Sequence, residues 1–294
     1  MKLLIDAQGG MAGDMFSAAL LSAGADFKSL QEVMLAAGQE LGSVQVEMKK
    51  TTDGASQLDI KLDSKRHHLG AGEAVEILTK LFDRFDIREK YRTTGMNILE
   101  ILTKAEIRAH REFNIIIEEE PHHHHHHENA EHAHHHAHPH AHPHAHHHGN
   151  HHGNHHEHHQ GHLVSPGEET FLHEAQDIVI DIMGAVMGMQ LLDIEPKAEL
   201  LAPVSVGGGH VHFSHGTLSV PAPATSIILA QYGLPWKKGP IEKELFTPTG
   251  AAILAALGAQ VNDTLAVKNL DVKFIGTSRG AKILDIPPLK LLLY

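Results

Sequence analysis

The chain has 294 residues, and 24 of its 31 histidines lie between His122 and His162, so this segment is considered separately from the rest. Residues 118–162 contain six Glu and no Lys or Arg, which is half of the formal net charge of −12. The other 249 residues are enough for a sizeable core, and their charge offers no basic stripe for a nucleic-acid backbone. The chain has no cysteine, which excludes disulfides, thiolate metal sites and thiol nucleophiles.

Neither a secretory signal nor a membrane span is predicted. The first apolar run reaches an acid at Asp6, and the longest apolar stretch, residues 178–194, contains Asp181 and Asp193. A bilayer-spanning helix needs about 20 predominantly apolar residues, and a signal peptide needs an uncharged apolar segment. We therefore expect a cytoplasmic protein with no membrane partner.

Hydrophobic periodicity predicts alternating strands and helices before the histidine-rich segment. Residues 3–6 are predicted to be a strand, followed by a glycine turn and a helix in which Met15, Phe16, Ala19 and Leu20 recur at helical spacing. A second helix is predicted at 27–41, and strands at 44–48 and 58–62 flank the Asp53-Gly54 turn signal. Two further helices are predicted, one with Val75, Leu78, Phe82 and Phe85 on one face and one running through Ile98, Ile101, Leu102 and Ala105 to His110.

After the histidine-rich segment, a long helix is predicted at 168–192, followed by alternating residues at 200–220, helices at 223–229 and 249–257, and strands at 267–275 and 289–293. This mixture predicts an α/β or α+β fold, a mixed sheet covered by helices and interrupted by a long, disordered, histidine-rich insertion. We expect residues 1–117 and 163–294 to form two parts of one α/β unit, with the insertion at 118–162.

The insertion begins with a run of six histidines: His122, His123, His124, His125, His126 and His127. Its Pro and Gly content and its few large apolar residues predict disorder. Imidazole suits nickel, copper and zinc, and an expression tag would lie at a terminus instead. We expect an auxiliary metal-binding tract that holds several ions loosely, with selectivity coming from elsewhere.

The predicted helix at 168–192 carries a possible metal site. His173, Glu174, Asp177 and Asp181 are spaced so that the three acids share one stripe and His173 pairs with Asp177 at i,i+4. A surface helix with its acids in water explains the same pattern. Glu106 and His110 form a weaker pair that a helix surface also explains.

A second candidate follows the glycine triplet Gly207, Gly208 and Gly209. On a strand, His210 and His212 would project to the same face about 6 to 7 Å apart, and His215 follows at a turn. Scattered surface histidines are the alternative. Glycines bring backbone amides close to a neighbouring group, as in an anion cradle. Ser205 and Ser214 lie near histidines but not in a nucleophile elbow.

The third candidate is the turn after the first strand, with Asp6, Gly10, Gly13 and Asp14. A glycine turn before a helix can bind phosphate through free amides. Two aspartates would repel bare phosphate, so a metal-bridged phosphate or direct metal binding fits better. A strand-end acid and a helix cap are the alternative. Neither the P-loop nor the dinucleotide fingerprint is present.

Several motifs occur in order along most of the chain: residues 10–16, 105–110, 171–174 with the two later aspartates, 203–209, 215–216, 220–225 and 247–252. Together they resemble the LarC family, the nickel-insertion proteins of nickel-pincer cofactor biosynthesis. A histidine-rich insertion is also common in that family.

The resemblance implies a CTP-dependent cyclometallase or chelatase of the lyase class. It would insert Ni²⁺ into pyridinium-3,5-bisthiocarboxylic acid mononucleotide and form the cofactor that a lactate racemase-type apoenzyme receives. On this reading the metal is held by Asp6, Asp14, His173, Asp177, Asp181, His210, His212 and His215. Glu174 is the candidate base for the pyridinium C–H proton, and the three glycines at 207–209, with Gly10 and Gly13, contact substrate or phosphate. We expect a homo-oligomer.

The chain departs from the family pattern in four places. The spacing between His173 and Asp177 is about two residues short, the tract separates His110 from Phe171, and the glycines at 276–280 lack their usual acid. Family members also continue into a C-terminal domain that binds metal–CTP, whereas this chain stops at Tyr294. We expect CTP, with a divalent metal, to enter only through such a domain or subunit.

Two other functions remain open. A nickel metallochaperone or storage protein would need only the tract and would have no catalytic activity of its own. A degenerate relative with a structural role is the third possibility. Removing residues 118–162 would abolish storage but would leave an insertase active at high nickel.

Overall fold

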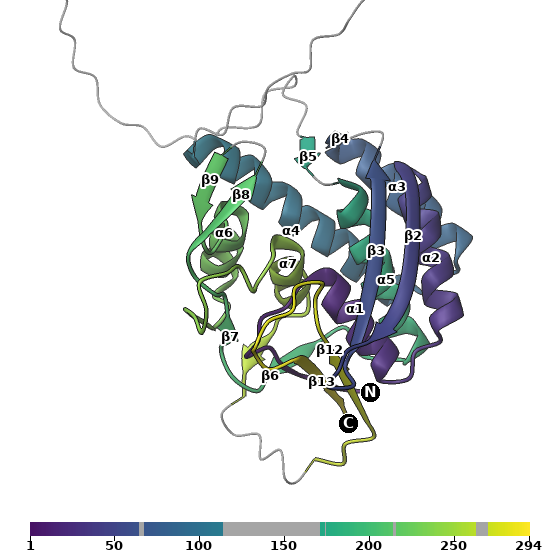
Figure 1. The fold of residues 1–294 in the computed structure, drawn as a ribbon. Helices are drawn as coiled ribbons and strands as arrows, with labels where there is room; N and C mark the ends of the chain where they lie inside the picture. The colour runs from purple at the N-terminus through teal and green to yellow at the C-terminus, as the bar shows by residue number, and fades with distance from the viewer. Residues whose placement is uncertain (65–67, 114–170, 174, 214–215, 263–269) are drawn as a thin grey trace, which may run out of the picture. The chain divides into compact units, whose positions relative to one another are not determined.

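Strands from both sides of the histidine-rich segment form one seven-stranded sheet (Figure 1). The computed structural model describes residues 1–64, 68–113, 171–173, 175–213, 216–262 and 270–294. The strands are β1 Leu3–Asp6, β2 Gly42–Lys50, β3 Ser56–Ser64, β4 His68–Gly70, β5 Phe171–His173, β6 Ala198–Leu200, β7 Val204–Ser205, β8 His210–Phe213, β9 Gly216–Ser219, β10 Trp236–Lys237, β11 Gln260–Val261, β12 Phe274–Ser278 and β13 Leu289–Leu293. The helices are α1 Gly13–Ser22, α2 Phe27–Gln39, α3 Ala71–Arg84, α4 Glu89–Phe113, α5 Ala175–Leu191, α6 Pro223–Tyr232 and α7 Pro248–Ala256.

The sheet has the order β11-β6-β1-β13-β12-β3-β2 and mixes parallel with antiparallel pairs. β1 lies inside the sheet, parallel to β6 and antiparallel to the central strand β13. Leu3, Leu4 and Ile5 are at most 1% exposed, as expected for a short apolar run without alternation. The predicted mixed α/β architecture, with helices covering a mixed sheet, is confirmed.

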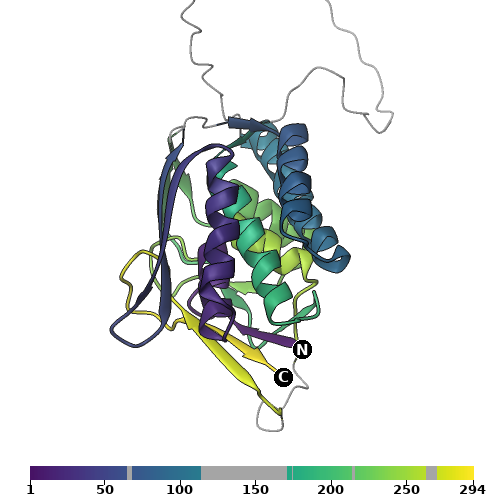
Figure 2. The ribbon, with the colours of Figure 1, turned by 90° about the vertical axis from the view of Figure 1, so that its right-hand side faces the viewer.

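Helices α1 and α5 pack closely beside the sheet. α1 contacts β3, β12 and β13, and α2 contacts β2, beside which Figure 2 shows the helices on one side of the long β2–β3 ribbon. Small residues let the two helices approach: a Cβ added at Gly184 would lie 2.5 Å from Ser17 Oγ, and one added at Gly188 would lie 2.7 Å from a methyl carbon of Leu20. α5 is therefore a largely internal helix, and its polar residues Gln176 and Asp181 are buried.

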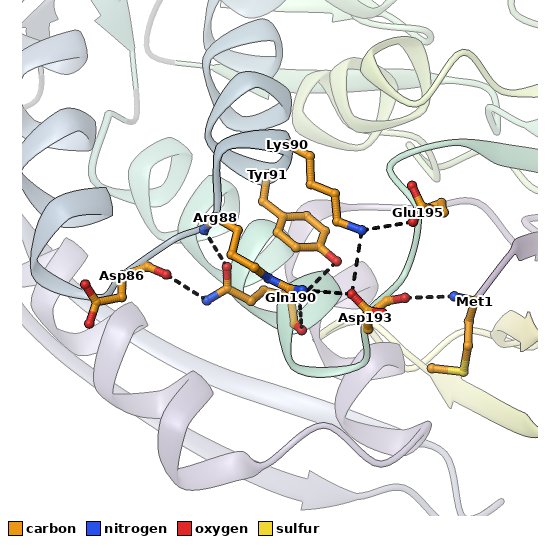
Figure 3. Close-up of polar contacts among 8 residues, drawn as sticks. All are labelled: Met1, Asp86, Arg88, Lys90, Tyr91, Gln190, Asp193 and Glu195. Atoms are coloured by element: carbon orange, nitrogen blue, oxygen red, sulfur yellow. Dashed lines mark hydrogen bonds and ion pairs between the residues drawn. The ribbon is translucent and has the colours of Figure 1, made fainter.

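Both ends of α5 are fastened to other elements. At its start, the buried Gln176 donates from Nε2 to the carbonyl oxygens of Gly38, at 2.9 Å, and Ser43, at 3.1 Å. At its end, Gln190 accepts from the amide of Arg88 at 2.7 Å, and the Arg88 guanidinium donates to Asp193 at 2.9 Å (Figure 3). These contacts fix the position of the helix along its axis.

The structure corrects part of the predicted secondary structure. The long helix at 168–192 is wrong at its start, because residues 171–173 form strand β5, which pairs with β4, and α5 begins at Ala175. His173 therefore does not share a helix with Asp177, so the helical spacing from which their pairing was predicted is wrong, and the pairing itself stays a prediction. The closing strand covers 274–278, and residues 270–273 of the predicted strand lie outside it. Val75, predicted to lie on a buried face, is 45% exposed.

The helices and strands predicted around 3–62, the helices at 223–229 and 249–257 and the last strand agree with the structure to within a few residues. Among the residues that the structure describes, no helix is both long and apolar enough to cross a bilayer. The histidine tract at 118–162 lies outside the described residues, so its predicted disorder and the predicted division of the chain stay predictions.

Candidate functional site

The turn between β1 and α1 is approached closely from two sides. Gly10 has φ +88°, a conformation that favours glycine, and a Cβ there would lie 2.0 Å from the carbonyl oxygen of Leu245. A Cβ at Gly9 would lie 1.9 Å from the carbonyl oxygen of Pro287. These glycines allow two distant segments, 244–247 and 284–288, to meet the start of α1.

The N-termini of α1 and α7 lie side by side. The amide of Met11 donates to Leu245 O at 2.8 Å, and the amide of Thr247 donates to Met11 O at 3.2 Å. These bonds form a parallel bridge between Met11 and Phe246, and each segment enters its helix two residues later. Both helices therefore direct the partial positive charge of their first turns toward the same region.

Asp14, in the first turn of α1, is a partly buried acid. Its Oδ1 accepts from the amide of Met15 at 2.7 Å. Burial raises the pKa of this carboxyl to about 6, against the opposing effect of hydrogen bonds from the amides of Met15 and of Asp14 itself. Asp14 is thus ionised at neutral pH but takes up a proton in mildly acidic solution.

Asp181 is a buried acid in the middle of α5, 2% exposed. A Cβ at residue 13 would lie 2.0 Å from its Oδ2, so the carboxyl fits only because residue 13 is glycine. Its Oδ1 has no hydrogen-bond partner among the described residues. Burial, followed by repulsion from Asp177 and Asp14, raises its pKa well above the ordinary value, and a hydrogen bond with Thr249 opposes the shift.

Asp177 and Asp14 are therefore both close enough to Asp181 to repel it, and these three aspartates are called here the acid cluster. The spacing argument correctly grouped the two α5 aspartates, and the fold brings Asp14 to them from a distant part of the chain. Within the described residues, no three His, Asp or Glu side chains are arranged as the ligands of one metal ion.

A pocket of about 170 Å³ opens beside the acid cluster. Asp14 lies in its wall together with Glu244 and Thr247 from the segment before α7. The loop between β12 and β13 provides Arg279, Lys282 and an apolar surface that includes Leu284, Ile286, Pro287 and Pro288. The pocket therefore combines carboxylates, cations and an apolar wall, the composition expected of a small-molecule site.

A model of the family described as "Nickel insertion protein" matches residues 3–130 and 113–293 of this chain. The chain belongs to the nickel insertion protein family. The match spans the elements that build the pocket and the acid cluster.

Individual relatives agree with the family match. One from Methanothrix thermoacetophila, which its name places among the nickel insertion proteins, is 30% identical over 256 residues, 86% of this chain and 49% of the relative. One from Dictyoglomus thermophilum, similarly named, is 25% identical over 98% of this chain and 58% of its own length. The pyridinium-3,5-bisthiocarboxylic acid mononucleotide nickel insertion protein of Desulfitobacterium hafniense is 40% identical over 124 residues, 42% of this chain and 29% of its own.

The chain spans about half the length of the first two relatives. No solved structure matches it.

The other predicted site residues of this nickel insertion protein lie in several places. Asp6 ends β1 and accepts from the amide of Gln8, at 3.3 Å, and from its Nε2, at 3.1 Å. His210 is exposed in β8, as predicted for a strand, and lies opposite Ser219 of β9, with His212 two residues further along the same strand. Glu174, His215 and the six histidines at 122–127 lie outside the described residues.

The glycine triplet is packed against the segment before α7. The amides of Gly207 and Gly208 donate to the carbonyl oxygens of Gly239, at 3.1 Å, and Lys243, at 3.2 Å. A Cβ at Gly207 would lie 1.8 Å from Lys243 O, and one at Gly209 would lie 3.0 Å from Glu242 O. Close backbone packing accounts for these glycines, and their binding of phosphate stays a prediction.

Sequence reasoning missed several residues at or near the site. Glu244, Thr249, Arg279 and Lys282 come from loops and a helix start with no periodic signal. His68 was also missed: the β4–β5 register places it opposite His173, and its only signal in the sequence is the His67-His68 pair. Whether any of the predicted metal ligands binds an ion stays a prediction.

Proposed function

We propose that this chain takes part in inserting Ni²⁺ into pyridinium-3,5-bisthiocarboxylic acid mononucleotide. The observation that carries the proposal is the position of Asp14, which belongs both to the acid cluster and to the wall of the pocket. The name of the Desulfitobacterium hafniense relative supports the choice of substrate. CTP dependence, a separate CTP-binding part, the lyase class, a homo-oligomer and delivery to a lactate racemase-type apoenzyme rest on the family resemblance alone.

Nickel is a substrate in this reaction, and the donor atoms of the site suit reversible binding of the ion. Carboxylate oxygens and imidazole nitrogens bind Ni²⁺, whereas the thiocarboxylate sulfurs of the nucleotide are softer ligands that form more covalent bonds with it. Asp14, in the pocket wall, would supply one oxygen atom. No three described acids or histidines form a ligand set by themselves, so the other predicted ligands, Asp6, Asp177, Asp181, His173, His210, His212 and His215, stay candidates for the remaining donors. The ion would then pass from oxygen and nitrogen to sulfur.

Loss of the pyridinium C–H proton requires an acceptor. A carboxylate whose pKa lies near the working pH is well matched to this task. Asp14, with a pKa of about 6 and a place in the pocket wall, meets this requirement. Glu174 stays the predicted base from the sequence, so both carboxylates are candidates.

The proposal is tested by substituting these two acids separately in a nickel-insertion assay. Asp14→Asn is expected to lower the yield of nickel-bearing nucleotide at least a hundredfold, because general-base catalysis contributes about 10²–10⁴. Asp26→Asn is the matched control, since Asp26 caps α2 outside the pocket and asparagine caps equally well. If Asp14→Asn and Glu174→Gln both insert nickel at the normal rate, with nickel affinity unchanged, neither residue is the base that accepts the pyridinium proton.

A storage function makes a different prediction. If the chain only stores nickel, deletion of residues 118–162 abolishes its role, because the tract carries most of the histidines. If it inserts nickel, the deletion variant forms the nickel-bearing nucleotide at high nickel concentration and fails only when nickel is scarce. Mass spectrometry of the nucleotide at two nickel concentrations distinguishes the two functions.

A further inference from the structure

The loop that joins β12 to β13, residues 279–288 and called here the pocket loop, forms one wall of the pocket. Arg279 fixes this loop from inside: its guanidinium donates to the carbonyl oxygens of Leu284, at 3.4 Å, and Ile286, at 2.7 Å. The same guanidinium pairs with Asp53, in the turn between β2 and β3, at 2.7 and 2.8 Å. The positive charge of Arg279 is thus already paired with the carboxylate of Asp53.

Other contacts fasten both ends of the pocket loop. Just before it, Ser278 Oγ donates to Met15 O at 2.6 Å, and near its start Gln57 Nε2 donates to Gly280 O at 2.6 Å. Near its end, the carbonyl oxygen of Pro287 lies against Gly9, where a Cβ would be only 1.9 Å away. The loop therefore meets the turn before α1 as a preformed wall.

Lys282 is the remaining cation among the described residues that line the pocket. It is exposed and makes no ion pair or hydrogen bond with the part of the chain that the structure describes. An ammonium group on a flexible stem binds phosphate as a point charge. Its neighbour Ile283 is fully exposed, so this stretch of the loop projects from the protein.

The size and lining of the pocket fit a single aromatic ring. A volume of about 170 Å³ is close to the roughly 150 Å³ cavity that binds benzene in an engineered protein, and it is too small for a whole nucleotide. Met15, Ile286 and Pro288 supply apolar surface, while Asp14 and Glu244 supply carboxylates. The apolar wall suits a flat aromatic ring such as pyridinium.

We propose that the pocket loop recognises the mononucleotide substrate. The pyridinium ring enters the pocket, the phosphate remains at the rim and pairs with Lys282, and Arg279 is a positioning residue that holds the wall in place. This inference rests on the proposed function, since it takes the pyridinium mononucleotide as the substrate, and it adds which residues discriminate the phosphorylated form.

Calorimetric titration of the full chain, without nickel or CTP, tests the role of Lys282. The probes are nicotinic acid mononucleotide and nicotinic acid riboside, which differ only in the phosphate. Lys282→Ala is expected to weaken mononucleotide binding about tenfold or more, as for loss of one charged hydrogen bond, and to leave riboside binding unchanged. Lys273→Ala, in the strand-side segment before β12 and outside the pocket lining, is the matched control and should change neither affinity.

Arg279→Lys separates positioning from direct recognition. Lysine keeps the positive charge but cannot bond Asp53 and two carbonyl oxygens at once. A positioning role predicts that both probes weaken by the same factor, so their affinity ratio stays that of the wild type. If the ratio falls instead, Arg279 itself binds the phosphate.

Two results would overturn the inference, and they differ in what they leave standing. Equal mononucleotide affinities for the wild type and Lys282→Ala would refute phosphate recognition by Lys282 but leave the proposed nickel insertion intact. Failure of the folded wild type to bind either probe or the bisthiocarboxylate nucleotide itself would refute both.

Discussion

At the scale of single residues, the acid cluster opposes folding at neutral pH. Asp14 ionises near pH 6 in the folded protein, against an ordinary value of 3.8. Between these values the folded state binds more protons than the unfolded chain, so the free energy of unfolding falls as pH rises. Above about pH 6 the ionised Asp14 lowers the free energy of unfolding by a constant amount. A shift of this size corresponds to about 3 kcal/mol at most.

Asp14→Asn should therefore stabilise the protein while it lowers nickel insertion. The expected gain in the free energy of unfolding is up to about 3 kcal/mol above pH 6, and little or none at about pH 3, below both pKa values, where Asp14 is largely protonated in both states. Urea denaturation at several pH values measures it. Asp26→Asn is again the control, because the serine hydrogen bonds lower the pKa of that carboxyl, and its removal should not stabilise the protein. A gain of undiminished size at about pH 3 would contradict this account.

Gly13 provides a second test at this scale. Gly13→Ala would place a Cβ 2.0 Å from Asp181 Oδ2, so we expect a loss of about 3 kcal/mol or more, as for severe overpacking. Gly72→Ala, in α3 with no atom within 4 Å of the new Cβ, should instead stabilise by about 0.5–1 kcal/mol. Similar stabilities of the two variants in urea would show that Asp181 does not pack against α1.

Residue spacing predicted part of the site for a physical reason. Asp177 and Asp181 are four residues apart, and that spacing places them on one side of any helix. Glu244 and Lys282 could not be predicted, because their approach to Asp14 depends on how the segments before α7 and after β12 pack against the first turn.

At the scale of elements, α5 positions two members of the acid cluster, and the hydrogen bonds of Gln176 hold the start of this helix in place. Gln176→Leu would remove two hydrogen bonds and leave the carbonyl oxygens of Gly38 and Ser43 without this donor. We expect a loss of about 2–4 kcal/mol in the free energy of unfolding. Gln260→Leu, which loses one exposed bond of 3.4 Å, should cost less than about 0.5 kcal/mol. Equal losses of stability for the two variants in urea denaturation would show that Gln176 does not hold the start of α5.

The start of α5 also shows why its sequence was misread. Phe171 and Leu172 continue the apolar pattern of the helix, so periodicity alone extends it backwards. In the structure Leu172 is buried in β5 opposite Leu69 of β4. Strand pairing with a segment about a hundred residues earlier is a tertiary effect that local pattern does not record.

At the scale of the whole molecule, the buried core joins side chains from residues 3–109 with side chains from residues 172–293. Deletion of 118–162 should therefore leave the thermal unfolding midpoint within about 3 °C, the shift that about 1 kcal/mol causes at this size. Removal of 289–294 should prevent folding, because it takes away β13, the central strand of the sheet. A large drop in the midpoint of the first variant would show that the tract contributes to the fold.

Asp14 belongs both to the acid cluster and to the pocket wall, and we propose that nickel is inserted there. In the direct test, the full chain is incubated with Ni²⁺, CTP, the bisthiocarboxylate mononucleotide and the part of the Methanothrix thermoacetophila relative that the chain does not match. The nucleotide is then analysed by mass spectrometry. We predict a nickel-bearing product with the wild type and with Asp26→Asn, and almost none with Asp14→Asn. Absence of product with the folded wild type, or equal product with Asp14→Asn, would contradict the claim.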